Sequence, residues 1–128
     1  MRFHALIRTH HITSRKKVGV LKRAADTHQC LVLLRSGGCP GIMYVEGPAQ
    51  AQVDAWVGVV RKLRYKDFQL VMRSAQLIPE GPDSAPAATS EADPLDGSLR
   101  EIDSVKEFGE WMARRRVWHW WRRGMGYA

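Results

Sequence analysis

CLVLLRSGGCPGIMYVEG, residues 30–47, holds two short apolar runs separated by a turn. The first run ends at Ser36-Gly37-Gly38 and the second at Gly47-Pro48. Glycine and proline are the residues that most often interrupt regular structure. Short apolar runs bounded in this way are typical of β-strands. We therefore predict two neighbouring strands, over residues 30–35 and 41–46.

The sequence on either side of these strands supplies one strand and one helix each. Apolar residues alternate over residues 2–10, which predicts a strand, and a helix capped near Ser14 follows to about residue 28. Helical spacing over residues 49–63 predicts a second helix, and residues 68–72 a fourth strand. This order predicts an α+β, ferredoxin-like βαββαβ sandwich, in which both helices cover one face of a four-stranded antiparallel sheet.

Charge and composition divide the chain into three segments. Residues 1–78 form the predicted ferredoxin-like core, with a net charge of +9. Residues 79–103 are rich in Pro, Ala and Ser, have a net charge of −6, and predict a mobile acidic linker. Residues 104–128, with a net charge of +4, predict a Trp/Arg-rich C-terminal helix that packs on the core. The basic segments favour anionic partners: nucleic acid, acidic proteins or anionic lipid.

Several classes of protein are excluded. No run of 18 apolar residues exists, so no transmembrane helix is predicted. The first residues lack the apolar core and cleavage site of a signal peptide. Two cysteines, Cys30 and Cys39, are too few for a disulfide scaffold. We expect a nuclear or cytoplasmic protein that is not secreted.

No catalytic motif is present. The sequence has neither a Gly-x-Ser-x-Gly elbow nor a phosphate-binding P-loop. Acylphosphatases, which share this small sandwich, need an asparagine, and the sequence contains none. Adjacent histidines on a strand point to opposite faces, which disfavours a metal site built from His10, His11, Cys30 and Cys39. We expect no enzyme activity, no metal, no cofactor and no small-molecule substrate.

The first candidate site is the turn that leads into the first helix, HHITSRKK, residues 10–17. Three cations in the first turn of a helix cost stability, by a few tenths of a kcal/mol each where exposed. Free N–H groups and cations together make a phosphate site, and a merely solvated turn is the alternative. The residues predicted to bind nucleic acid are His10, His11, Arg15, Lys16 and Lys17, with Arg8, Lys62 and Arg73 widening the patch.

The second candidate site is the sheet face turned away from the two helices. His4, Leu6, Arg8 and His10 share this face if the alternate residues point inward, and Tyr44 and Arg73 lie beside them. Such a basic face with an aromatic side chain can stack a single strand of nucleic acid. Alternatively, the C-terminal helix covers it.

The third candidate site is the tail. On a helical wheel Trp111, Trp118 and Trp121 share one side, with arginines opposite, as in an amphipathic basic helix. This helix either docks on the core or binds a protein partner. We do not expect it to bind a membrane surface.

Three motifs together resemble one family. Residues 10–17 are similar to its basic motif after the first strand. Residues 38–47, GCPGIMYVEG, are similar to its Gly-x-Pro-Gly…Val-Glu-Gly signature. Trp56 followed by RKLRYK, residues 61–66, is similar to its second helix and the following turn.

The family these motifs resemble is the C-terminal domain of pre-mRNA-splicing factor three, of the small nuclear ribonucleoprotein, which also forms the C-terminal half of some RWD-domain-containing proteins. The resemblance implies a ferredoxin-like fold and contact of residues 10–17 with RNA, a duplex with a single-stranded overhang.

We therefore predict a non-catalytic RNA-binding module that contacts phosphates through the turn before the first helix. The alternative is a protein-interaction module that uses the Trp-rich tail. The acidic linker is predicted to fold over the basic patch and compete with anions. Deleting residues 79–98 would then raise the affinity for RNA at low salt.

Overall fold

The two strands of residues 30–47 pair with each other inside the sheet. In the computed structural model, which describes residues 1–81 and 84–127, β2 (Leu31–Arg35) and β3 (Gly41–Gly47) are antiparallel. β1 (Phe3–Thr9) pairs with the other edge of β3, and β4 (Gln69–Gln76) pairs with β1. The strand order β4-β1-β3-β2 is that of the predicted βαββαβ unit.

A fifth strand extends the sheet beyond β2. β5 (Leu99–Ile102) runs parallel to β2, which makes the sheet mixed and five-stranded. The predicted α+β class is confirmed, but the prediction of a purely antiparallel sheet of four strands is wrong. Four residues are too few for alternation to distinguish a strand from the linker in which it was placed, and pairing with β2 decides its conformation.

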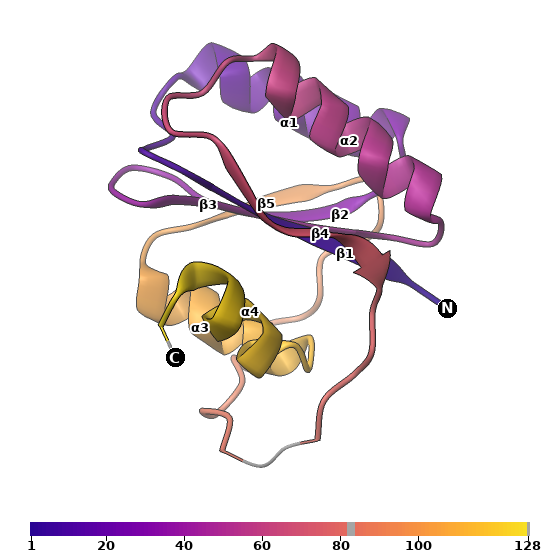
Figure 1. The fold of residues 1–128 in the computed structure, drawn as a ribbon, viewed down its shortest axis with the longest axis vertical. Coiled ribbons are helices and arrows are strands. Elements are labelled where there is room, and N and C mark those ends of the chain that lie inside the picture. The colour runs from indigo at the N-terminus through magenta and orange to yellow at the C-terminus, as the bar shows by residue number, and fades with distance from the viewer. Residues whose placement is uncertain (82–83, 128) are drawn as a thin grey trace.

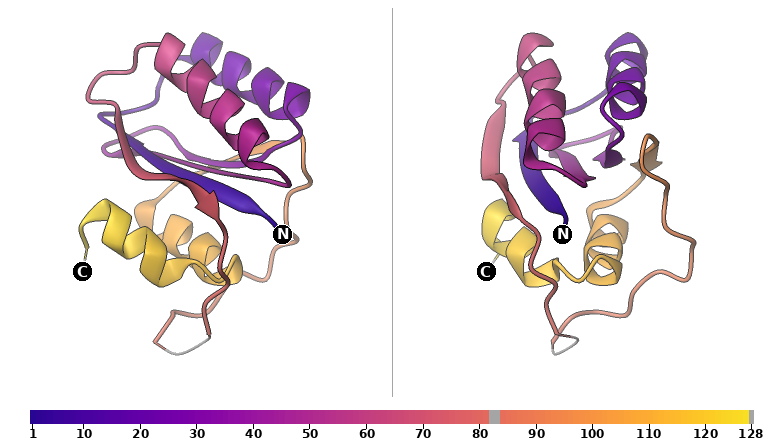
Figure 2. Two further views of the ribbon diagram at one scale, coloured as in Figure 1. Left: turned by 45° about the vertical axis from the view of Figure 1, so that its right-hand side comes forward. Right: turned by 90° about the vertical axis from the view of Figure 1, so that its right-hand side faces the viewer.

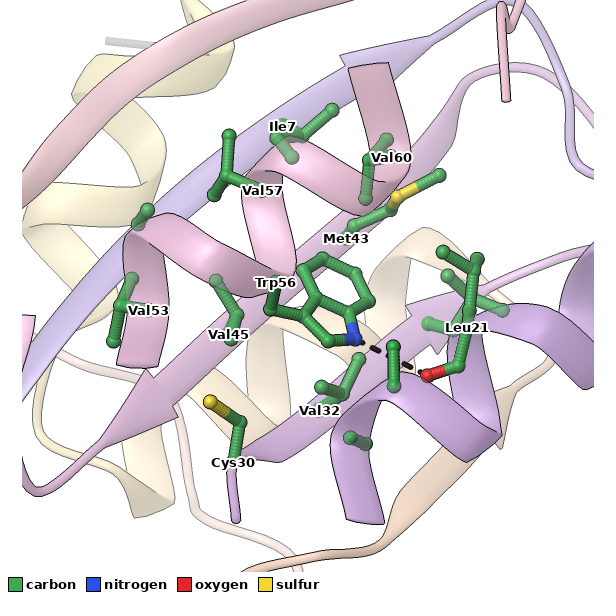
Figure 3. Close-up of a cluster of buried hydrophobic side chains, with 14 of the residues drawn as sticks. Ile7, Leu21, Cys30, Val32, Met43, Val45, Val53, Trp56, Val57 and Val60 are labelled. Atoms are coloured by element: carbon green, nitrogen blue, oxygen red, sulfur yellow. Dashed lines mark hydrogen bonds between the residues drawn. The ribbon is translucent and has the colours of Figure 1, made fainter. Parts of the chain in front are cut away.

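Helices α1 (Arg15–Thr27) and α2 (Gln50–Lys62) cover one face of the sheet (Figure 1). Trp56 of α2 lies at the centre of this core, fully buried among aliphatic side chains (Figure 3). Its indole N–H donates a 3.1 Å hydrogen bond to the Leu21 carbonyl of α1. A buried indole needs such a partner, so this bond ties the two helices together.

Helices α3 (Val105–Arg114) and α4 (Trp118–Met125) cover the opposite face, giving a three-layer arrangement (Figure 2). The single predicted C-terminal helix is therefore wrong. The helical conformation is interrupted at Arg116, which has a φ of 62°, and the chain reverses direction before α4. Glu80 stabilises the break, because its carboxylate accepts hydrogen bonds from the backbone N–H groups of His119 and Trp120 at 2.9 and 2.8 Å.

Acidic residues of the predicted linker form ion pairs with arginines of the folded body. Asp96 pairs with Arg2, and Asp93 pairs with Arg114 and Arg115. Residues 82 and 83 of this segment, and residue 128 of the predicted tail, lie outside the described residues. Across residues 1–81 and 84–127, no helix is both long and apolar enough to cross a membrane.

Candidate nucleic-acid interface

The topology brings the N-terminus of α1 and the C-terminus of α2 to one end of the sheet. β1 ends there, β4 begins there, and the turn between β2 and β3 lies beside them. The backbone N–H of His10 donates to the Lys66 carbonyl at 3.0 Å, which joins the two sides. We call this surface the basic end, and its cationic residues are Arg8, Arg15, Lys16, Lys17, Arg35, Arg61, Lys62, Arg64 and Lys66.

At the N-terminus of α1, the Ser14 hydroxyl caps the helix by accepting from the Lys17 N–H at 3.2 Å. No acidic residue lies in the first turn. The Lys17 amine lies 4.9 Å from the centre of the Tyr65 ring, whereas Lys16 is exposed. The Arg15 guanidinium is engaged by both carboxylate oxygens of Glu101 on β5, at 2.8 and 2.7 Å. Of the three predicted phosphate ligands here, Arg15 is therefore already paired with an anion.

His10 and His11 are exposed beside the same turn, with ring centres 4.8 Å apart. The His10 ring lies 3.7 Å from the Asp67 carboxylate and 3.7 to 3.8 Å from the Cys39 sulfur. His10, Asp67 and Cys39 line an open hollow of about 810 Å³. Arg8, Phe68 and Tyr127 line the same hollow. The hollow thus combines a cation, Arg8, and the Asp67 carboxylate with the aromatic surface of Phe68 and Tyr127, and aromatic side chains are what single-stranded nucleic acid stacks on.

The other side of the basic end consists of α2 and the loop that follows it. Lys62, predicted from the sequence, is exposed here. Sequence reasoning missed Arg64 and Lys66 as site residues, although they belong to the RKLRYK run that carries part of the family resemblance. In the part of the chain that the structure describes, Lys16, Lys62, Arg64 and Lys66 form no ion pair. Their charge is thus available to an anionic partner.

Arg8 and Arg73, both predicted to widen the basic patch, lie in different places from each other. Arg8 lies at the basic end, and its guanidinium donates to Gln69 Oε1 at 2.6 Å. Arg73 is exposed on the edge strand β4, four residues beyond Gln69. At about 3.3 Å per residue of strand, this places it about 13 Å away along β4. Arg73 is therefore separate from the cluster around α1.

The sheet face proposed to stack bases is covered by α3 and α4. Leu6 and Tyr44 are fully buried, and Trp120 stacks on the His4 ring with ring centres 3.9 Å apart. Of the two alternatives for this face, the covering C-terminal segment is the one observed. The face is not free to stack a single strand of nucleic acid.

A buried polar network lies beneath this cover. Glu46 is fully buried and accepts from the Tyr44 hydroxyl at 2.8 Å, from Arg2 at 2.5 Å and from Arg115 at 2.5 and 3.1 Å. Because Tyr44 uses its only proton on Glu46, His4 Nδ1 must be the donor in its 3.2 Å contact with the Tyr44 oxygen. Figure 2 shows the C-terminal helices packed beneath the N-terminal strand, the two parts that this network joins.

The protonation states follow from the burial and the partners of each group. Burial raises the pKa of Glu46, but the hydrogen bond and charge of Arg115, with Tyr44 and Arg2, outweigh it, so the pKa is below its usual value. Burial lowers the pKa of His4 to about 4, against a smaller opposing effect of the Glu46 charge. Glu46 is therefore ionised and His4 neutral at physiological pH.

The three tryptophans proposed to bind a partner are placed differently from one another. Trp111 and Trp121 are only 4% and 3% exposed, and both belong to the core between the sheet and the C-terminal helices. Their apolar surface is covered by other side chains of this core. Trp118 is partly buried and has the Arg122 guanidinium 5.0 Å above its ring. Only Trp118 of the three retains surface for a partner.

The comparisons with known proteins give no assignment. No protein-family model matches the sequence, and no curated protein is significantly similar to it. Among the described residues, no group of three or more His, Cys, Asp or Glu side chains is arranged to hold a metal ion. The function must therefore be argued from the charges and contacts of the chain itself.

Proposed function

We propose that the chain is a non-catalytic RNA-binding module whose basic end contacts backbone phosphates. One observation carries the proposal: a single end of the fold gathers nine lysines and arginines, and several of them form no ion pair with any residue that the structure describes. Lysine and arginine clustered on one face are the electrostatic signature of a nucleic-acid site. The resemblance of residues 10–17, 38–47 and 61–66 to the C-terminal domain of pre-mRNA-splicing factor three supports RNA as the polyanion.

The proposed ligand is a duplex with a single-stranded overhang. The cations of α1 and of the loop after α2 are suited to a phosphate backbone, which supplies affinity with little reading of sequence. The adjoining hollow with Phe68 and Tyr127 is suited to unpaired bases, which stack on aromatic side chains. Nuclear or cytoplasmic localisation follows from this proposal.

The test is fluorescence anisotropy of labelled RNA of this form, titrated at several salt concentrations. Lys16→Ala/Lys62→Ala/Lys66→Ala removes three exposed cations of the basic end that have no ion-pair partner within residues 1–81 and 84–127. Each phosphate contact contributes roughly 0.7 to 0.9 to the slope of log affinity against log salt. The triple variant is expected to bind more weakly and to lose about two units of slope.

A variant with the same loss of charge elsewhere provides the control. Arg23, Lys106 and Arg123 are exposed outside the basic end, and Arg23→Ala/Lys106→Ala/Arg123→Ala is expected to retain most of the affinity and the slope. Equal losses of RNA affinity in the two variants would show that binding depends on net charge and not on the basic end. Binding that is indifferent to salt would instead favour a protein partner at Trp118.

A further inference from the structure

The N-terminus of α1 already holds an anion, and that anion belongs to the chain. Both nitrogens of the Arg15 fork donate to the two oxygens of Glu101, at 2.8 and 2.7 Å. The Ser36 hydroxyl donates a third hydrogen bond to Glu101, at 2.7 Å. A planar guanidinium binds carboxylate and phosphate through this same two-point geometry. A phosphate and Glu101 therefore compete for these two nitrogens of Arg15.

Glu101 reaches this place through the fifth strand. β5 pairs in parallel with β2, and Glu101 stands opposite Leu34 in that register. The hydrogen bond from Arg15 is the main cause that lowers the pKa of Glu101 to about 2, with Ser36 and the charge of Lys22 adding to it. The carboxylate is therefore charged at any physiological pH and competes as a full anion.

We propose that Glu101 is an intramolecular competitor for phosphate at the basic end, an inference that rests on the proposed RNA-binding function. RNA gains the two-nitrogen face of Arg15 only when that face releases Glu101. The pair thus lowers the affinity for any single phosphate, and ligands that also engage Lys16 and the loop after α2 are favoured over isolated anions.

The sequence-based expectation assigned the competition to the whole acidic linker, residues 79–103, which includes Glu101. Its proposed test deletes only residues 79–98. In that segment Asp96 pairs with Arg2 and Asp93 with Arg114 and Arg115, none of which belongs to the basic end. Arg2 precedes the seven residues of β1, and the basic end follows them, which is about 23 Å at the rise of a strand. A deletion of residues 79–98 would leave Glu101 in the chain.

Asp96 supplies a matched control. Like Glu101, it binds an arginine through two oxygens, at 3.1 and 2.7 Å, and the two carboxylates are 36% and 35% exposed. Asp96→Asn and Glu101→Gln therefore remove the same charge from similar ion pairs. Only the second pair lies at the basic end. Asp96 and Glu101 are five residues apart, which is at most about 17 Å of extended chain, or up to about twice the screening length of about 8 Å at physiological salt.

The experiment measures RNA affinity by anisotropy for the full chain and these two variants. Glu101→Gln is expected to bind about threefold more tightly, as the loss of an exposed ion pair permits. Asp96→Asn is expected to change affinity by less than about 1.5-fold, because its charge is screened from the site. An unchanged affinity in Glu101→Gln, or an equal gain in both variants, would overturn the proposal.

A double-mutant cycle separates competition from net charge. Arg15→Gln is expected to cost little in the wild-type background and about threefold more in the Glu101→Gln background, since only there is Arg15 free. Lys16→Ala is expected to cost the same in both. Additive effects of Arg15 and Glu101 would contradict direct competition.

Two further measurements keep the result interpretable. Ser36→Ala removes one hydrogen bond to Glu101 without changing charge, and a gain of affinity in it supports the proposal even if Glu101→Gln folds poorly. Loss of binding in Lys16→Ala/Lys62→Ala/Lys66→Ala tests the RNA site itself without altering either partner of the Arg15–Glu101 pair. Wild-type protein that does not bind RNA would refute the proposed function and this inference together, whereas intact binding without a Glu101 effect would refute only this inference.

Discussion

Replacing Glu46 by glutamine tests whether the buried network holds the C-terminal helices on the sheet. The substitution preserves size but removes a fully buried charge that two guanidiniums contact at 2.5 Å. Breaking a buried ion pair by neutralising one partner costs about 3 to 5 kcal/mol. Arg2 and Arg115 keep second partners, Asp96 and Asp93, so the lower value applies. We expect Glu46→Gln to lose about 3 kcal/mol of unfolding free energy.

The assay is urea and thermal unfolding followed by circular dichroism at pH 7. For a chain of this length, 3 kcal/mol corresponds to a fall in Tm of about 12 °C. Asp96→Asn is the control, because it removes a partly exposed carboxylate from the same Arg2 and is expected to cost under about 1 kcal/mol. A Glu46→Gln variant as stable as Asp96→Asn would refute the reasoning, since Arg2 and Arg115 would then tolerate the loss of their buried counter-ion.

The pH dependence gives a second readout of Glu46. Its folded-state pKa is depressed, so its stabilising contribution is fully present above the unfolded-state pKa of about 4.3 and is lost as the pH falls through the lower folded value. The difference in stability between wild type and Glu46→Gln is therefore expected to be largest at neutral pH and to shrink below about pH 4. A difference in stability that stays constant down to pH 2 would show that the effect of the substitution does not come from the charge of Glu46.

Three further outcomes are expected. Burial lowers the pKa of His4 to about 4, so the unfolded chain binds the His4 proton first and the free energy of unfolding falls as the pH drops from about 6.5 to 4. His4→Phe should flatten that part of the plot of urea-unfolding free energy against pH, and an unchanged plot would exclude His4 as its source. Gly124→Ala places a Cβ 2.7 Å from Met72 Cγ and should lower the free energy of unfolding in urea by about 1 kcal/mol, because overpacking outweighs the gain in helix propensity. A stabilised variant would contradict this close contact of α4 with the sheet. Exposed Cys39 should react rapidly with a thiol reagent, while Cys30, buried and with its pKa raised to about 11 mainly by burial, should react only on unfolding; two equally fast thiols would contradict the placement of Cys30.

The βαββαβ part of the fold could be predicted from sequence because each of its elements carries its own local pattern. The predicted and observed limits of the two central strands differ by one residue at most. β5 carries no such pattern, and it is a strand only because β2 offers an edge that the chain reaches more than sixty residues later. The break before α4 likewise depends on Glu80, which is distant in sequence.

The candidate site divides in the same way. Residues 10–17 are contiguous, so their shared charge is visible in the sequence. Arg64 and Lys66 join them only through the topology that returns α2 to the end where α1 begins. The engagement of Arg15 by Glu101 spans 86 positions and could not be inferred from either residue. The burial of Trp121 could not be predicted from the sequence for a related reason. The pattern of an amphipathic helix shows its apolar side but not which residues cover that side.

The placement of α3 and α4 has a consequence for the order in which the chain can fold. Residues 1–78 complete four strands and two helices, yet Leu6, Leu33 and Ile42 on the second face of the sheet belong to a core that residues after position 98, such as Phe108 and Trp121, largely complete. During synthesis from the N-terminus, this apolar face therefore emerges before its cover. A chain interrupted near residue 78 would expose a contiguous apolar surface, the feature that leads nascent proteins to aggregate or to be held by chaperones.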